Sequence, residues 1–105
     1  MFADNLKTLP LVDHIQSLSL FNTEGKNVGS IENKPGQSGS LRLYYFLSQK
    51  YQGNITIEAA QEGLNLYAEH TADAQKNPGK HPNIDRLLSL IEAKEVLRVA
   101  PLSNA

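Results

Sequence analysis

The chain has 105 residues, of which 40% are hydrophobic and 20% charged, the ordinary composition of a globular protein. A chain of this length buries roughly 60–65% of its unfolded surface, enough for one modest core, so we expect a single domain over residues 1–105. Cysteine is absent, which excludes disulfides, cysteine nucleophiles and cysteine-bound metal centres.

The charge is nearly balanced, with 10 Lys and Arg against 11 Asp and Glu and a formal net charge of -1. Because a nucleic-acid surface normally needs a basic excess, we expect no nucleic-acid partner. The chain opens without the basic and then apolar pattern of a signal peptide, and no apolar run approaches the ~18–20 residues that cross a bilayer. We therefore expect a cytoplasmic protein without a membrane segment.

A short helical pattern begins at Phe2 and stops at Pro10, whose ring cannot continue a helix. Apolar residues then alternate with polar ones over 15–21 and again over 28–32, with a glycine-containing turn between the two segments. This pattern is typical of a β-hairpin. Neither strand is long or apolar enough to be stable alone.

Helical spacing returns after a loop rich in proline and glycine. The first of three further helices is predicted over 41–52, with Ser38 or Ser40 as its N-cap. Gly53 is the expected C′ residue, because a left-handed backbone costs glycine little. The aromatic residues of this helix are interpreted as core packing.

The longest helix is predicted from 57 to about 76, with Thr56 as its N-cap. Apolar residues cover more than half of its circumference, so it should pack on two sides. Ala59, Gly63 and Leu66 form a shallow notch on this surface, where another helix can approach the backbone closely. The notch can receive a helix of the same chain, which we favour slightly, or a protein partner or second copy of the chain.

Pro78 ends this helix, and the next is predicted over 84–94 with Asn83 as its N-cap. Alternation over 95–99 predicts a closing strand, and 100–105 is interpreted as a loose tail. Strands at both ends of the chain with helices between them favour an α+β fold. We expect a small sheet, made of the β-hairpin and the C-terminal strand, covered on one face by three helices.

The break between the last two predicted helices gathers ionisable side chains. His70 and Asp73 are i, i+3 neighbours on one helix, while His81 and Asp85 flank the start of the next. Such a set can bind zinc, manganese or iron, so a metal-binding protein or metal-dependent enzyme is one alternative function. The spacing matches no metal motif and each residue also has a structural explanation. We therefore predict no metal and keep the four residues as candidate ligand-binding residues.

The loop from Lys34 to Ser40 is a second candidate site. Gly36 and Gly39 permit close backbone approach and the following helix dipole favours an anion, so Lys34, Ser38 and Ser40 are candidate ligands of an anion or nucleotide. The glycine patterns of nucleotide-binding loops are absent. A turn with positive φ and a serine cap explains the same residues, and the sequence slightly favours that simpler interpretation.

The sequence assigns no catalytic residue and no cofactor. It contains no Gly-x-Ser-x-Gly nucleophile elbow. The acidic residues of the longest helix spread along one solvated face instead of pairing for acid–base catalysis. His14 has no recognisable partner in the sequence and is interpreted as structural. The balance of these observations is against an enzyme.

Three stretches together resemble a family of small uncharacterised bacterial proteins, a domain of unknown function of about this length. They are Gly29–Gly36 with Gly39–Tyr44, Glu69–Ala74, and Pro78–Leu87. The resemblance covers nearly the whole chain and implies a bacterial cytosolic origin, but it carries no activity and no functional residues. The leading hypothesis from the sequence is a small α+β binding or interaction module that uses the notch of its longest helix.

Overall fold

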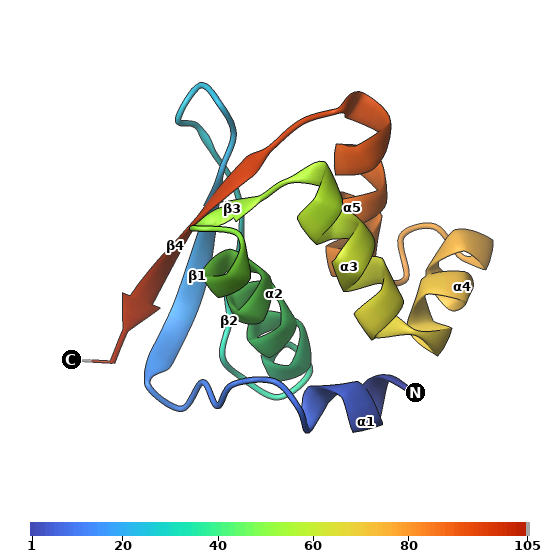
Figure 1. The fold of residues 1–105 in the computed structure, drawn as a ribbon, viewed down its shortest axis with the longest axis horizontal. Helices are drawn as coiled ribbons and strands as arrows, with labels where there is room; N and C mark the ends of the chain where they lie inside the picture. The colour runs from blue at the N-terminus through green and yellow to red at the C-terminus, as the bar shows by residue number, and fades with distance from the viewer. Residues whose placement is uncertain (105) are drawn as a thin grey trace.

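Residues 1–104 are described by the computed structural model, which shows a four-stranded antiparallel sheet with five helices on one side of it (Figure 1). The strands are β1 (Ile15–Phe21), β2 (Asn27–Glu32), β3 (Asn54–Ile55) and β4 (Leu97–Ser103). The helices are α1 (Phe2–Leu6), α2 (Ser38–Lys50), α3 (Ile57–Tyr67), α4 (Glu69–Lys76) and α5 (Pro82–Ala93). The predicted α+β class is confirmed.

The sheet has the strand order β2-β1-β4-β3, so that β1 is central and pairs antiparallel with both β2 and β4. Alternation along β1 sends Leu18 and Leu20 into the core, where both are fully buried. Ile31 lies opposite Leu18 on β2, and Val99 lies opposite Leu20 on β4. The predicted hairpin and closing strand therefore supply the inner face of the sheet.

The prediction of a loose tail after residue 99 is wrong. Ala100 pairs with Ser19, and Ser103 still pairs with Ile15 near the start of β1. One edge of β1 pairs with β2, and the N–H and C=O groups of the other edge need a second strand as a partner. The strand β4 pairs with this edge as far as Ser103, although Pro101 lacks an N–H. The short strand β3, which pairs only with the start of β4, was not predicted, because two residues carry no periodicity.

The predicted helix caps need correction at three of four positions. Thr56 caps α3 as expected, and its Oγ1 accepts the N–H of Ala59 at 3.1 Å. Neither Ser38 nor Ser40 caps α2, which begins at Ser38 after an N-cap at Gln37.

The other two corrections concern Gly53 and Asn83. Two residues after α2 have a positive φ, Gln52 with 59° and Gly53 with 88°, and Gly53 N–H donates to Ser48 O at 2.6 Å. This bond closes a Schellman motif in which Gln52 is the C′ residue, one residue earlier than predicted, and Gly53 is the C″ residue. The N-cap of α5 is His81, and Pro82 takes the first helical position, where its missing N–H costs nothing.

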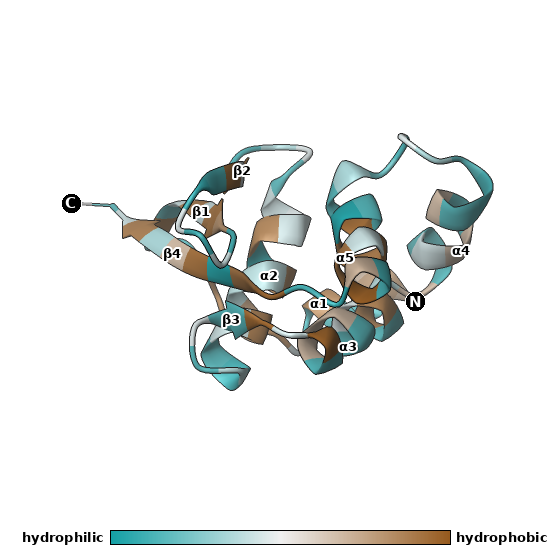
Figure 2. Ribbon diagram, turned by 90° about the horizontal axis from the view of Figure 1, so that it is seen from above, coloured by the Kyte–Doolittle hydropathy of each residue, from teal (hydrophilic) through white to brown (hydrophobic). Residues whose placement is uncertain are grey.

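The prediction of one helix over 57–76 is also wrong, because the chain breaks between α3 and α4. Ala68 stands at the break with φ 54° and ψ -117°. Thr71 Oγ1 donates to Leu64 O at 2.6 Å and so satisfies a carbonyl that the interrupted helix leaves open. In Figures 1 and 2, α4 stands beside α3 and α5 instead of continuing the axis of α3.

The notch on α3 is filled from within the chain. Ala59 is fully buried, and a Cβ built on Gly63 would lie 2.9 Å from Leu87 Cδ1 and 3.0 Å from Leu47 Cδ1. Leu47 belongs to α2 and Leu87 to α5, so the missing side chain lets both helices approach α3. This is the intramolecular contact that the sequence favoured, and it leaves Leu66 half-buried at its edge.

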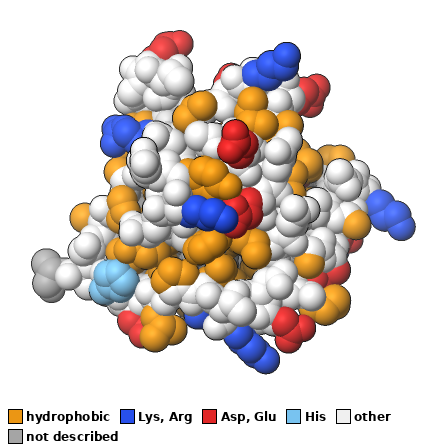
Figure 3. Space-filling view, viewed as in Figure 1, with side chains coloured by type: hydrophobic (Ala, Val, Ile, Leu, Met, Phe, Trp, Pro, Cys, Tyr) orange, Lys and Arg blue, Asp and Glu red, His pale blue; other side chains and the backbone are white. Residues whose placement is uncertain are grey.

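The buried hydrophobic side chains form one cluster between the sheet and the helices. Figure 2 shows hydrophobic residues along α2, α3 and α5 and along the strands β1 and β4. The face in Figure 3 mixes apolar side chains with charges of both signs. Within residues 1–104 no helix has the length and apolar character to span a membrane.

Candidate functional site

The two candidate segments of the sequence meet in one cleft of about 330 Å³. One wall is the start of α2, with Gly36, Gly39 and Ser40, and the opposite wall is the turn from Lys80 into α5. Side chains from α1, α3 and α4 close the remaining sides. The cleft thus brings together parts of the chain about forty residues apart, from five helices.

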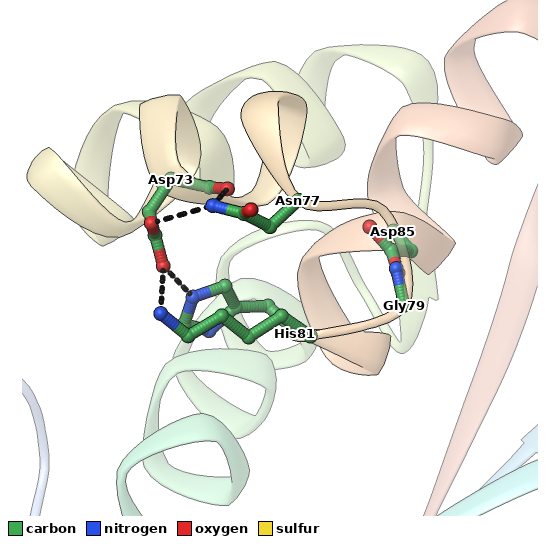
Figure 4. Close-up of polar contacts among 6 residues, drawn as sticks. Asp73, Asn77, Gly79, His81 and Asp85 are labelled. Carbon is green, nitrogen blue, oxygen red and sulfur yellow. Dashed lines mark hydrogen bonds and ion pairs between the residues drawn. The ribbon is translucent and has the colours of Figure 1, made fainter.

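Among the predicted site residues, His70, His81 and Ser40 line this cleft. Lys34 does not, since its ammonium group pairs with Glu32 at 2.9 Å outside it. Asp85 turns away and accepts the N–H of Gly79 at 2.9 Å, as Figure 4 shows. Ser38 begins α2 but is not part of the lining.

Asp73 connects the cleft to α4. Its Oδ2 atom lies 2.6 Å from His81 Nε2 and 3.0 Å from Lys80 Nζ, and its Oδ1 atom accepts from Asn77 Nδ2 at 3.0 Å (Figure 4). The hydrogen bonds from His81 and then Lys80 lower the pKa of the Asp73 carboxyl from 3.8 to about 2. Asp73 is therefore ionised at neutral pH and holds the two cleft residues together.

The histidine rings stand side by side, with 5.6 Å between the ring centroids of His70 and His81. Phe2 packs its ring edge-to-face with His70 at 5.2 Å and stacks on Tyr67 at 5.1 Å. The N–H of Phe2 donates to Glu69 Oε1 at 2.8 Å, which fixes the start of the chain against α4. Within residues 1–104 no three His, Asp or Glu side chains converge as metal ligands.

Tyr67 orients Ser40 from below the cleft. The Tyr67 hydroxyl donates to Ser40 Oγ at 2.7 Å. Burial raises the pKa of Tyr67 well above its usual value, so the phenol stays protonated and remains a donor. Because Ser40 Oγ accepts this bond, its own O–H is available to donate toward the cleft.

Asn83 is oriented in the same way from the other wall. Arg86 Nη1 donates to Asn83 Oδ1 at 2.8 Å, and Tyr44 donates its hydroxyl proton to Asn83 O at 2.5 Å. A guanidinium group only donates, so the side-chain oxygen of Asn83 must face Arg86 and the NH₂ group faces the other way. Burial raises the pKa of Tyr44 to about 12, which keeps this phenol protonated as well.

The first turns of α2 and α5 add backbone donors. The N–H groups of Gly39, Ser40 and Asn83 have no acceptor within residues 1–104, whereas Leu41 already donates to Gln37 O and Ile84 to His81 O. These are the open N–H groups of helix N-termini. Together with Ser40 Oγ, Asn83 Nδ2 and Lys80 Nζ, they give the cleft a polar surface made largely of donors.

Comparison with protein families finds a match to the model of an uncharacterized protein conserved in bacteria, DUF2322, over residues 2–101. The match covers every residue that lines the cleft. The chain therefore belongs to this bacterial family, as the resemblance in the sequence predicted. Comparison with curated proteins and with solved structures gives no match.

Sequence reasoning missed several residues of this cleft. The sequence gives Lys80 no role and gives Asn83 only the role of a helix N-cap, although both residues lie within two positions of His81. Tyr67 belongs to the apolar surface of the longest predicted helix, and nothing in its spacing indicates that its hydroxyl reaches Ser40. Phe2 had no signal at all, because its place depends on how α1 folds back onto α3.

Proposed function

We propose that this protein binds a small anionic molecule, one that carries a phosphate or carboxylate group, in the cleft between the N-terminal ends of α2 and α5. One observation supports this proposal above all: two separate helix starts, with N–H groups that lack an acceptor within residues 1–104, line the same cleft as Lys80. An anion accepts such bonds at every oxygen, whereas a neutral or cationic ligand leaves several donors unpaired.

The electrostatics of the cleft favour the same ligand. The N-terminus of each helix carries a partial positive charge, and the N–H groups of Gly39, Ser40 and Asn83 lie at two such ends. Lys80 adds a positive charge, which the ionised Asp73 carboxylate balances at 3.0 Å as long as no other anion takes its place. Charge-assisted hydrogen bonds of this kind are roughly twice as strong as neutral ones.

The size and walls of the cleft suggest an organic anion. A volume of about 330 Å³ lies at the lower end of the range for small-molecule sites. Phe2, Pro82 and Ile84 line it with apolar surface next to the donors. The apolar walls can contact the carbon skeleton of a ligand while the donors hold its anionic group.

The other hypotheses from the sequence are less well supported. A metal site using all four candidates is disfavoured, because Asp85 is held by Gly79 and Nε2 of His81 is engaged by Asp73. A partner surface through Ala59 and Gly63 is disfavoured, because both residues are buried. The cytoplasmic location stays a prediction.

Binding of inorganic phosphate, measured as a rise in melting temperature, tests the proposal. A ligand that binds only the folded chain stabilises it in a saturable way. Lys80→Ala removes one charge-assisted bond and should raise the half-saturating phosphate concentration about tenfold. Lys26→Ala is the matched control, since Lys26 lies in the hairpin turn and its loss should leave the half-saturating concentration unchanged. The proposal would be contradicted if sodium chloride of equal ionic strength raised the melting temperature as much as phosphate does. It would also be contradicted if both variants changed the half-saturating phosphate concentration equally.

A further inference from the structure

Ala68 has a backbone conformation that an L-amino acid rarely adopts. Its φ of 54° lies in the left-handed region, and its ψ of -117° lies far outside the small area that non-glycine residues tolerate there. Alanine has the highest helix propensity, and the residues around it have a continuous helical pattern. Local preference therefore favours a straight helix through Ala68, so other contacts must hold the bend.

The contacts that hold the bend are mostly polar. Ala74 is the only buried residue of α4. Glu69 accepts the N–H of Phe2, and Thr71 bonds back to Leu64 O. A helix with so little buried apolar surface gains little from packing, so its position depends on hydrogen bonds and ion pairs.

The strongest polar attachment of α4 uses groups that an anionic ligand would need. A single oxygen, Asp73 Oδ2, lies 2.6 Å from His81 Nε2 and 3.0 Å from Lys80 Nζ. Both partners line the cleft, and Asp73 is the carboxylate that reaches them from α4. A bound phosphate or carboxylate group would present its own oxygens to the same two nitrogen atoms.

Building on the anion-binding function proposed above, we infer that Asp73 is an internal competitor of the ligand and that Ala68 is the hinge on which α4 moves when an anion displaces it. Without ligand, Asp73 holds α4 in the bent position. An anion that binds Lys80 and His81 releases Asp73. The backbone of Ala68 can then leave its unfavourable conformation, so that α4 continues the axis of α3 more closely. The two states bind the ligand with different affinities, which is the condition for a ligand to shift their populations.

The first test compares two carboxylates of equal charge. Asp73→Asn should lower the half-saturating phosphate concentration about tenfold, because no internal anion then competes for Lys80 and His81. Asp85→Asn is the matched control, since within residues 1–104 this carboxylate accepts the Gly79 N–H alone. The half-saturating phosphate concentration of this variant should stay that of the parent protein. Equal effects of the two variants would overturn the competition, because they would reflect only the lost negative charge.

The second test measures the movement itself. The chain has no cysteine, so Gln61→Cys with Gln75→Cys places one spin label on α3 and one on α4, both at exposed positions. In a continuous helix these fourteen residues would span about 21 Å. We expect one shorter distance without ligand and a second, longer distance with inorganic phosphate or in Asp73→Asn. A control pair at Gln61 and Glu92, on α3 and α5, should not change.

The two proposals fail in different ways. If the amides of Gly39, Ser40 and Asn83 respond to phosphate but the label distance stays short, the cleft binds anions and the hinge is wrong. If phosphate leaves the signals of those amides unchanged, the proposed anion site is wrong, and the proposed competition by Asp73 is wrong as well. If Asp73→Asn leaves the ligand-free distance short, Asp73 does not hold the bend.

Discussion

At the scale of single residues, Asp73 is the side chain on which the cleft depends most. It joins α4 to Lys80 and His81, and its carboxylate accepts bonds from three side chains in all. The sequence identified Asp73 correctly as an i, i+3 neighbour of His70. It did not indicate that the contact runs to His81 instead, because that pairing crosses a turn whose shape depends on Gly79 and its bond to Asp85.

Removing the Asp73 carboxylate should change stability in a pH-dependent way. The pKa of this group is lowered from 3.8 to about 2, so its ionised form favours the folded state above pH 3.8. That contribution is lost as the pH falls from about 4 through about 2, where the folded protein also takes up the proton. Urea midpoints of the parent and Asp73→Asn should differ at pH 7 and converge near pH 2. A difference that stays constant over this range would contradict the assignment.

At the scale of elements, the break at Ala68 positions the site. It turns α4 so that His70 lines the cleft and Asp73 reaches it, whereas a continuous helix would carry both residues along the axis of α3. The sequence could not reveal this break. Residues 57–76 have one helical pattern without glycine or proline near position 68, and tertiary contacts override that preference.

Two glycine substitutions test the backbone at this break. Ala72→Gly lies at an exposed position inside α4 and should destabilise the protein by about 1 kcal/mol. Ala68→Gly should cause no loss and a gain of up to about 1 kcal/mol, because glycine adopts positive φ without a steric penalty. Urea unfolding with an unchanged m value is the measurement. Equal losses at the two positions would mean that residue 68 is helical in solution.

A second feature at the scale of elements is the close approach of α2, α3 and α5 at Gly63. Gly63→Leu should overpack the space between Leu47 and Leu87 and destabilise the protein by roughly 1–3 kcal/mol. Asn65→Leu is the control, since it adds the same side chain at an exposed position of α3. Light scattering should give the same mass for both variants and the parent. A Gly63→Leu protein that stays equally stable would show that this contact is not tight.

At the scale of the whole molecule, the cleft follows from how the helices are stacked on the sheet. The helices α2 and α5 both contact α3 at Gly63, and residues at their N-terminal ends line the same cleft. The sequence predicted the fold class, the hairpin and both candidate segments. It could not predict that the segments join, because their meeting depends on packing between residues far apart in the chain.

The sequence also could not predict how far the sheet extends. Residues 100–103 have weak alternation and contain Pro101, so local preference alone indicates a tail. They form a strand because β1 offers them an unpaired edge. Local patterns thus predicted which elements form, whereas the ends of β4 and the break in α3–α4 were decided by tertiary contacts.

The anion-binding cleft is the central claim, and a residue-resolved titration tests it most directly. Inorganic phosphate should shift the ¹⁵N–¹H signals of Gly39, Ser40 and Asn83 with one common, saturable dissociation constant, because all three N–H groups border the same ligand position. The amides of Gly25 and Gly53, in turns outside the cleft, should stay in place. Saturable shifts of Gly25 and Gly53 equal to those of the three cleft amides would contradict it. So would no response of the three cleft amides at concentrations of phosphate that exceed those in cells.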